Sequence, residues 1–375
     1  MRSGHSRRSR GLGLLIWKLA LVAALSVAAP DARAGSPAKW HPGHYVFVGH
    51  GKIGPEHLAQ HFRGVQKCYA WNLLEPEHGR YDFSAVRSDL ALLQRHGKRL
   101  VLQLQYKAFG KDGCYAPAYL RGPGYGGGVY RASSGSLNPV LWNAKVGERM
   151  DALSVALGRE LDREPVLEAV VLPETAPSAN LAKSPQDGVE AYTPIGYMEA
   201  LKQRMLAVRR AFPNTVVIQY ANYPPDLLEQ LTDYMKEIGV GLGGPDVYPR
   251  PDGVSDPKKG VYRLYPKMSG VVPLGAAVQS PDYSVANKKR TAAFDRGHDR
   301  NSVAVTPEEE TPIPVREHLR LAQEKLKLNY LFWAAHPKGC FDNVKRMLAE
   351  PDLAKDPAGG LDGRCPPRAF LGPAK

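Results

Sequence analysis

The stretch "DFSAVRSDLALLQRHGKRLVLQLQY", residues 82–106, joins a helix pattern directly to a strand pattern. Apolar residues recur at helical spacing from Val86 to Leu93, Ser84 suits an N-cap, and Gly97 suits the position just after the last turn. The mostly apolar run that follows Gly97 is typical of a buried strand. A helix followed at once by a strand is characteristic of parallel β/α units.

The same alternation extends along the chain, where eight strand-like runs occur and helical patterns lie between several of them. The strands are expected at 44–50, 65–73, 98–106, 166–174, 215–223, 238–248, 272–280 and 328–336. The helices are expected at 84–96, 143–162, 195–211, 225–236 and 315–327. Eight such units favour an α/β fold of the (β/α)8 TIM-barrel type over an open sheet. No G-x-G-x-x-G follows the first run, which counts against a dinucleotide-binding fold.

Long segments follow several of the expected strands, whereas the joins from helix to strand are short. The long segments are 107–142, 175–194, 249–270 and 281–314. In (β/α)8 barrels the loops after the strands form the functional end of the barrel. The sequence therefore predicts a barrel with long βα loops and a binding site among them.

The first 34 residues have the pattern of a signal peptide. A basic segment precedes an apolar stretch, and Ala32-x-Ala34 offers a cleavage site. We therefore expect an exported protein, periplasmic or secreted, with a barrel domain over 35–345 and a Pro/Gly-rich tail over 346–375. No later segment approaches the eighteen apolar residues of a membrane span, so none is expected in the mature chain.

The charge balance is basic. The chain carries a net charge of +13, and removing the six basic residues and one acidic residue of the leader leaves +8. In an exported protein this charge favours an anionic polysaccharide, cell wall or lipid surface as partner, with plain solubility as the alternative. Residues 284–301 form a basic insertion that either contacts such a glycan or is a solvated loop. No basic-aromatic motif predicts nucleic-acid binding.

Four cysteines are an even number, which suits disulfides in an oxidising compartment. Three pairings are possible. Cys340–Cys365 would pin the tail to the last helix, and Cys68–Cys114 would then join two early strand-end loops. The chain has no C-x-x-C and no H-E-x-x-H, so neither a metal nor another cofactor is expected.

The segment around the second strand, "CYAWNLLEPEHGRYDF" (68–83), contains a W-x-x-x-E-P-x-x-G-x-Y-D-F pattern. In this respect it resembles the (β/α)8 glycoside hydrolases of the large retaining group that includes barrel β-galactosidases, xylanases and cellulases. The matching residues are Trp71, Glu75, Pro76, Gly79, Tyr81, Asp82 and Phe83. We interpret Glu75 as structural, holding a turn, rather than catalytic.

The resemblance implies that a Glu at the end of the fourth strand is the acid/base, and Glu174 stands there. Apolar neighbours would raise the pKa of its carboxyl, so that it can donate a proton to a leaving glycosidic oxygen. Pro173 occupies the position where such enzymes usually have an Asn. The alternative is that Glu174 only forms a salt bridge with an arginine at the barrel rim.

The resemblance also implies a nucleophilic Glu at the end of the seventh strand, where this chain has Gln279 or Ser280. Asp246, which ends the sixth strand, and Asp282 are the available carboxylates, and we favour Asp246. Carboxyl separations of ~5–5.5 Å or ~6.5–9.5 Å would distinguish retaining from inverting chemistry. Alternatively Gln279 positions a water or a substrate amide, and the protein works by another route or does not catalyse.

Aromatic and amide side chains at the strand ends suit a polyhydroxylated ligand. Flat rings stack on pyranose faces, and amides donate to and accept from hydroxyl groups. The candidates are Trp71, Tyr220, Tyr248 and Trp333 for stacking, and Gln103, Gln105, Asn222 and Gln279 for polar contacts. The sequence thus predicts an exported glycoside hydrolase acting on a polysaccharide or oligosaccharide. The alternative is a catalytically inactive barrel that binds glycan without turnover.

Overall fold

The structure is a computed structural model that describes residues 39–371. The predicted signal peptide, residues 1–34, lies outside the described residues. The described residues contain the whole barrel together with the predicted tail as far as Leu371.

Eight parallel strands close into a barrel in the order β1-β10-β9-β8-β7-β6-β3-β2. They are β1 (Gly43–Gly49), β2 (Gly64–Ala70), β3 (Arg99–Gln105), β6 (Leu167–Leu172), β7 (Val216–Tyr220), β8 (Gly241–Gly244), β9 (Leu274–Val278) and β10 (Tyr330–Ala334). The predicted (β/α)8 barrel and its eight strands are confirmed, although several strands are shorter than expected. A small antiparallel pair, β4 (Val129–Arg131) with β5 (Leu137–Pro139), lies in the loop after β3.

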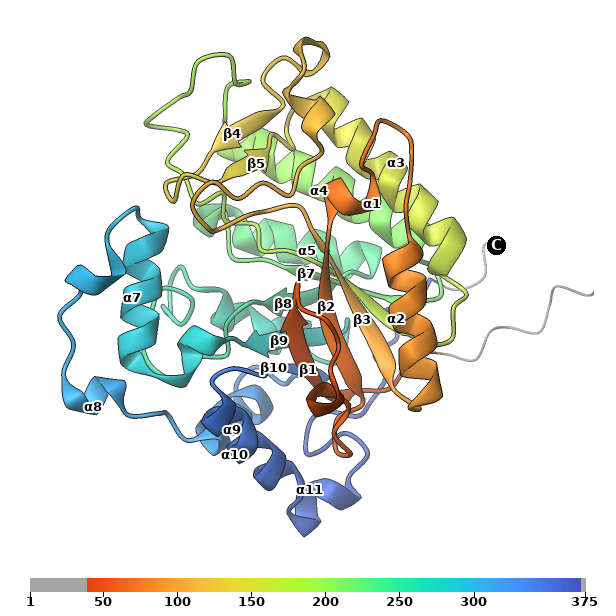
Figure 1. The fold of residues 1–375 in the computed structure, drawn as a ribbon, viewed down its shortest axis with the longest axis vertical. Helices are drawn as coiled ribbons and strands as arrows, with labels where there is room; N and C mark the ends of the chain where they lie inside the picture. The colour runs from red at the N-terminus through yellow and green to blue at the C-terminus, as the bar shows by residue number, and fades with distance from the viewer. Residues whose placement is uncertain (1–38, 372–375) are drawn as a thin grey trace, which may run out of the picture. The chain divides into compact units, whose positions relative to one another are not determined.

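Helices surround these strands (Figure 1). They are α1 (Trp71–Leu74), α2 (Ser84–Arg95), α3 (Ala144–Leu161), α4 (Pro194–Ala211), α5 (Leu228–Ile238), α6 (Tyr265–Met268), α7 (Val285–Asp295), α8 (Pro307–Glu310), α9 (Val315–Glu324), α10 (Lys338–Leu348) and α11 (Pro351–Lys355). The five predicted helices correspond to α2, α3, α4, α5 and α9. The other helices were not predicted, including α7 and α8, which lie within the long segment after β9.

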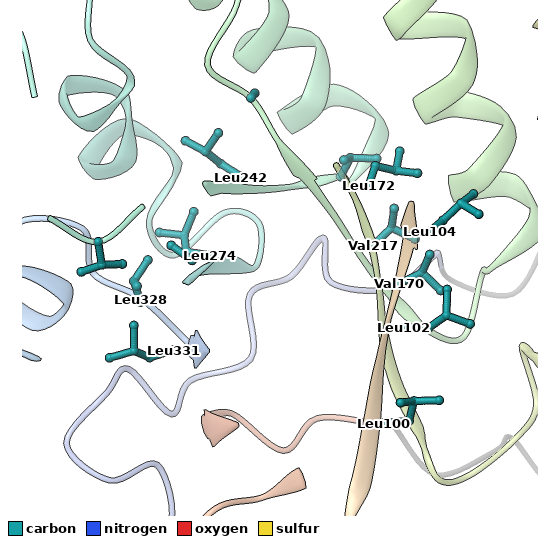
Figure 2. Packing of buried hydrophobic residues seen from close by; sticks show 14 of the residues in the cluster. Leu100, Leu102, Leu104, Val170, Leu172, Val217, Leu242, Leu274, Leu328 and Leu331 are labelled. Carbon is teal, nitrogen blue, oxygen red and sulfur yellow. The ribbon is translucent and has the colours of Figure 1, made fainter. Parts of the chain in front are cut away.

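The side chains of β3 show how the strands divide the core. Leu100, Leu102 and Leu104 join the large apolar cluster that also contains helix residues, and Figure 2 shows them along the same strand. Val101 belongs instead to a second cluster made of barrel residues alone. Successive strand residues point to opposite faces, so the leucines face the helices and the alternate residues face the barrel interior.

The two ends of α2 differ in how well they were predicted. Gly97 has a φ of 61°, so it takes the left-handed conformation expected of a glycine after the last turn. The N-cap prediction was wrong, because Phe83 occupies that position and Ser84 is already helical. The Asp82 carboxylate accepts the hydrogen bond from the Ser84 N–H at 2.9 Å instead, so the cap comes from two residues earlier.

The C-terminal segment is held beneath the barrel by hydrogen bonds to the joins that lead into the strands. Asn329 donates to the Asp362 carbonyl at 2.7 Å, Trp40 donates to the Gly363 carbonyl at 2.9 Å, and the Leu371 N–H donates to the Pro213 carbonyl at 3.0 Å. These partners precede or flank the strands, so the segment covers the end of the barrel opposite the βα loops.

The predicted disulfides are not formed, because all four cysteines are free thiols. Cys340 lies in the first turn of the helix that follows β10, at the βα-loop end, whereas Cys365 lies in the segment at the opposite end. The barrel therefore separates the pair that was expected to pin the tail. Cys68 lies buried on β2, and the Cys114 thiol is directed at the Ala116 carbonyl.

In the part of the chain that the structure describes, no helix is both long enough and apolar enough to cross a membrane.

We expect that Gly64→Ala destabilises the barrel. Gly64 pairs with Arg99 across β2 and β3, and a Cβ there would come within 1.9 Å of the Arg99 carbonyl oxygen. Relieving that clash requires backbone movement in a closed ring, at a cost of about 1–3 kcal/mol. Chemical denaturation measures the loss in the free energy of unfolding. Gly253→Ala is the control, since its Cβ meets no atom within 4 Å; equal stability of the two variants would contradict the expectation.

Candidate active site

Two adjoining cavities open among the loops at the C-terminal ends of the strands. The inner cavity, about 230 Å³, lies at the barrel mouth, and the outer cavity, about 480 Å³, extends toward α7. Both are lined by Phe109, Gly110, Glu174, Pro245 and Gln279. Glu174 thus lies where the two cavities meet, as expected for a functional residue of a (β/α)8 barrel.

The Glu174 carboxylate is held by an amide from the next strand. Asn222, which follows β7, donates from its Nδ2 to Glu174 at 2.6 Å. The Asn222 Oδ1 accepts the Ala176 N–H at 2.9 Å, and this bond fixes the orientation of the amide. Asn222 was predicted to bind substrate, and its side-chain amide is directed instead at the carboxyl of Glu174.

Burial raises the pKa of Glu174 to about 6. The positive charge of Lys107 opposes this shift, and the negative charge of Asp246 adds to it. Lys107 is itself buried, with its Nζ donating to the Ala176 carbonyl at 2.6 Å, and burial lowers its pKa to about 7. The predicted raised pKa of Glu174 is thus present, and below about pH 6 the carboxyl carries the proton that a general acid needs.

Asp246, the favoured second carboxylate, lines the outer cavity and forms an ion pair with Lys288 of α7 at 2.5 Å. Lys288 also pairs with Asp282 at 2.7 Å. Burial opposes the charge of Lys288, but the two carboxylates outweigh it and raise the pKa of the ammonium. Lys288 therefore stays charged and binds both acids together.

The Asp282 carboxyl is placed differently from Asp246. It is fully buried, is absent from the lining of both cavities, and accepts the Gln279 N–H at 2.8 Å. With one oxygen on that N–H and the other on Lys288, Asp282 anchors the start of the loop after β9. Its surroundings are those of a structural residue.

Amides form one side of the inner cavity. Gln103 Nε2 donates to Gln105 at 3.1 Å, and Gln66 donates to both Gln103 and the Tyr220 hydroxyl. Gln103, Gln105, Tyr220 and Gln279 all line this cavity, as predicted for residues that contact substrate. Every second side chain of β3 points into the barrel, so Val101 lies on the same face as Gln103 and Gln105 and below them. The barrel interior therefore changes from apolar at its floor to polar at its mouth.

The two predicted tryptophans do not line either cavity. Trp333 is fully buried in the cluster between strands and helices, and its Nε1 donates to His44 at 2.9 Å. Its neighbours Phe332 and Tyr330 face the barrel interior, so Trp333 must face outward. Trp71 is fully buried in α1 and donates to Glu75 at 2.9 Å. Their expected roles in stacking on a sugar are therefore wrong.

Tyr248 is also displaced from the cavities beside Glu174. It lines a separate cavity of about 470 Å³ with residues of α9, and its ring lies 5.2 Å from the Lys288 ammonium. The predicted stacking of Tyr248 on a sugar beside Glu174 is therefore not supported.

The structural interpretation of Glu75 agrees with its contacts. Its carboxyl is fully buried, accepts the Gly79 N–H at 2.9 Å, and forms an ion pair with Arg149. It holds the turn between α1 and α2 and lines neither cavity.

Several residues that line the cavities were not predicted from the sequence. Phe109 lines both cavities and Asp295 lines the outer one. His50 and Tyr115 line the inner one, with their ring centroids 4.4 Å apart and their planes tilted. Phe109 and Tyr115 lie in the long segment after β3 and His50 in the loop after β1, where periodicity carries no signal. Asp295 ends α7, and the sequence pointed to it only through the length of the segment after β9 and the basic insertion at 284–301.

Over residues 39–371, no three His, Cys, Asp or Glu side chains come together in a way that could hold a metal ion.

No protein-family model matches the chain, and no curated protein matches it. Solved structures similar to it include the β-galactosidases from Rahnella sp. R3 (11% identity, 79% of this chain and 51% of that one, TM-score 0.48) and Marinomonas ef1 (10%, 78% and 53%, 0.47). Another is an exo-β-1,4-mannosidase from Opitutaceae bacterium strain TAV5 (15%, 80% and 55%, 0.43). The chain spans about half the length of each. Similarity at this level concerns the fold alone.

We expect that Lys107→Met raises the pKa of Glu174 above its wild-type value of about 6. The Lys107 charge favours the ionised carboxylate, so its removal favours the protonated form. Carbon-13 NMR titration of labelled glutamate carboxyls measures the midpoint, and Glu174→Gln identifies the resonance. Lys111→Met, an exposed lysine of the same loop, is the control. An unchanged or lowered midpoint in Lys107→Met would contradict the charge assignment.

Proposed function

We propose that this protein is a glycoside hydrolase in which Glu174 donates a proton to the glycosidic oxygen. The observation that supports it is the Glu174 carboxyl itself, which lies where two cavities meet and has a pKa of about 6. A carboxyl with this pKa is protonated under mildly acidic conditions and can act as a general acid.

The lining of the inner cavity supports a carbohydrate as the substrate. Gln103, Gln105 and Gln279 provide amide donors and acceptors, and Phe109 and Tyr115 provide aromatic surface. A cavity of about 230 Å³ is smaller than the roughly 300–1,000 Å³ typical of drug-sized ligands, so it suits one sugar ring. The larger outer cavity then receives the rest of a polysaccharide or oligosaccharide.

The preference for an anionic polysaccharide is a separate part of the proposal. The net positive charge of the chain supports it, as does Arg300, an exposed base that lines the outer cavity.

Hydrolysis by carboxyl groups needs a second carboxylate near Glu174. Gln279 lines both cavities at the end of β9, but an amide is not a nucleophile. Asp246 and Asp295 both line the outer cavity, and both raise the pKa of Glu174 through their charges. The lining of the outer cavity thus includes Glu174 and two further carboxylates, which supports a hydrolytic mechanism.

A second candidate is a barrel that binds glycan without cleaving it. Gln279 in place of the expected nucleophile and the Asp246–Lys288 ion pair favour this alternative. It shares the ligand class of the first proposal and differs only in turnover.

We further propose that the chain is exported and cleaved after Ala34, to act in the periplasm or outside the cell. The basic and apolar segments of residues 1–34 support this part of the proposal.

Glu174→Gln should reduce hydrolysis by roughly 10²–10⁴-fold, because it removes the proton donor while keeping the side-chain size. Reducing-end assays on mannan, xylan, β-glucan, galactan, alginate and polygalacturonate measure the activity, and wild-type activity should fall as the pH rises through about 6. Glu190→Gln, a control in the loop after β6, should keep full activity.

Three results of this assay lead to different conclusions. Full activity in Glu174→Gln would refute its role as the acid. Binding of one of these polysaccharides to wild type without any cleavage would favour the non-catalytic alternative. Neither cleavage nor binding would remove both candidates.

For export, the mature protein recovered from a bacterial host should begin at Gly35 in N-terminal sequencing of periplasmic or secreted fractions. Ala34→Phe should slow processing, because signal peptidase requires a small residue at that site. Full-length, unprocessed protein in the cytoplasmic fraction would argue against export.

A further inference from the structure

We propose that Asp295 is the general base of the reaction, activating the water that attacks the sugar opposite Glu174. This inference rests on the proposed hydrolase function and assigns its second carboxylate to a residue of the segment after β9.

The position of Asp295 is set by α7, of which it is the last residue. Near the start of this helix, Lys288 is fixed by Asp246 and Asp282. The next residue, Lys289, forms an ion pair with Glu309 at 2.5 Å and so joins α7 to α8. Ion pairs thus hold the helix at the outer cavity, and its C-terminal end brings Asp295 to the cavity wall.

The Asp295 carboxyl is available for a ligand. Among the residues that the structure describes, no donor forms a hydrogen bond or an ion pair with it, although it is partly buried. Burial raises the pKa of Asp295, with the nearby charge of Arg300 opposing the shift. A carboxylate with a raised pKa accepts a proton from water more readily than an ordinary one.

Asp246 is less suited to this role, although it lines the same cavity. One of its oxygens is 2.5 Å from the Lys288 ammonium, which takes a lone pair that an attacking water would otherwise use. The contacts assign Asp246 to holding α7 in place through Lys288. On this assignment Asp246 is a positioning residue.

Asp295 and Glu174 both line the outer cavity. Burial is the main cause of the raised pKa of Glu174, and the negative charges of Asp246 and, to a smaller extent, Asp295 add to it. An ionised carboxylate therefore helps to keep its counterpart protonated. Hydrolysis needs this pair of opposite protonation states at the start of the reaction.

The proposed step is a single displacement. Glu174 gives its proton to the glycosidic oxygen as the bond from that oxygen to the anomeric carbon breaks. Asp295 takes a proton from water while the water oxygen bonds to the anomeric carbon from the opposite face. The products are an alcohol and a sugar of inverted anomeric configuration, and proton exchange with solvent restores both carboxyls. No covalent intermediate forms, so the absence of a carboxylate at Gln279 is no obstacle.

The experiment compares Asp295→Asn, Asp246→Asn and Glu174→Gln on the polysaccharide of the panel above that wild type cleaves. Proton NMR at early times should show the anomer of inverted configuration from wild type. Asp295→Asn should lose roughly 10²–10⁴-fold in kcat. Sodium azide should restore turnover in this variant and yield a glycosyl azide of inverted configuration, because azide attacks without needing a base. Glu308→Gln, on α8 of the same segment, should keep wild-type activity.

The outcomes separate this inference from the function on which it rests. Loss of activity in Glu174→Gln together with near-normal activity in Asp295→Asn would overturn the role of Asp295 and leave the hydrolase intact. Retention of anomeric configuration by wild type would overturn it too. Full activity in Glu174→Gln would remove the proposed function itself. Thermal unfolding and circular dichroism of Asp295→Asn test whether the variant is folded, so that a loss of activity reports on catalysis and not on unfolding. Asp295→Ala is a second variant, and azide should restore its turnover equally.

Discussion

Closure of eight parallel strands into one ring is the constraint on which the site depends. Each strand is hydrogen-bonded to a neighbour on both sides, and successive residues must point alternately toward the helices and toward the barrel interior. On β3 this alternation directs the leucines outward and places Gln103 and Gln105 at the mouth. Because all the strands run the same way, their C-terminal ends meet around one opening, and Glu174, Asn222, Asp246 and Gln279 converge there from four different strands.

The opening is built from two kinds of surface with different electrostatics. Among residues 39–371, the inner cavity is lined by amides and aromatic rings and has Glu174 as its one carboxyl. The lining of the outer cavity also includes Asp246, Lys288, Asp295 and Arg300. Glu174 lies on the boundary, where burial and neighbouring carboxylates keep its proton while Lys107 limits the shift. The barrel thus gives its acids unequal environments, which is the condition for assigning them opposite roles in catalysis.

The segment after β9 contributes more to the site than its composition indicated. The sequence predicts a basic insertion in this segment. In the structure, its basic residues Lys288 and Lys289 form ion pairs that hold α7 in place. The helix in turn presents a carboxylate to the cavity, so a segment that is basic overall supplies an acid at the cavity wall. The segment thus presents Asp295 to the cavity alongside its bases Lys288 and Arg300.

Local patterns in the sequence predicted the eight strands, five of the helices between them, the closed barrel and the position of Glu174 at the end of a buried strand. These features depend on short-range periodicity and on strand-to-loop transitions. The same patterns identified Gln103, Gln105, Tyr220 and Gln279, which follow the alternation at strand ends. Only the tertiary structure decided whether an aromatic side chain at a strand end points into the barrel or toward the helices, as Trp333 does. It also brought Lys288 to Asp246, and Asp295 to the cavity that Glu174 lines. Ion pairs between residues far apart in the chain, such as Lys288–Asp246, hold α7 in place, and no periodic pattern records such contacts. Tertiary structure also separates Cys340 from Cys365, because the barrel lies between these two thiols.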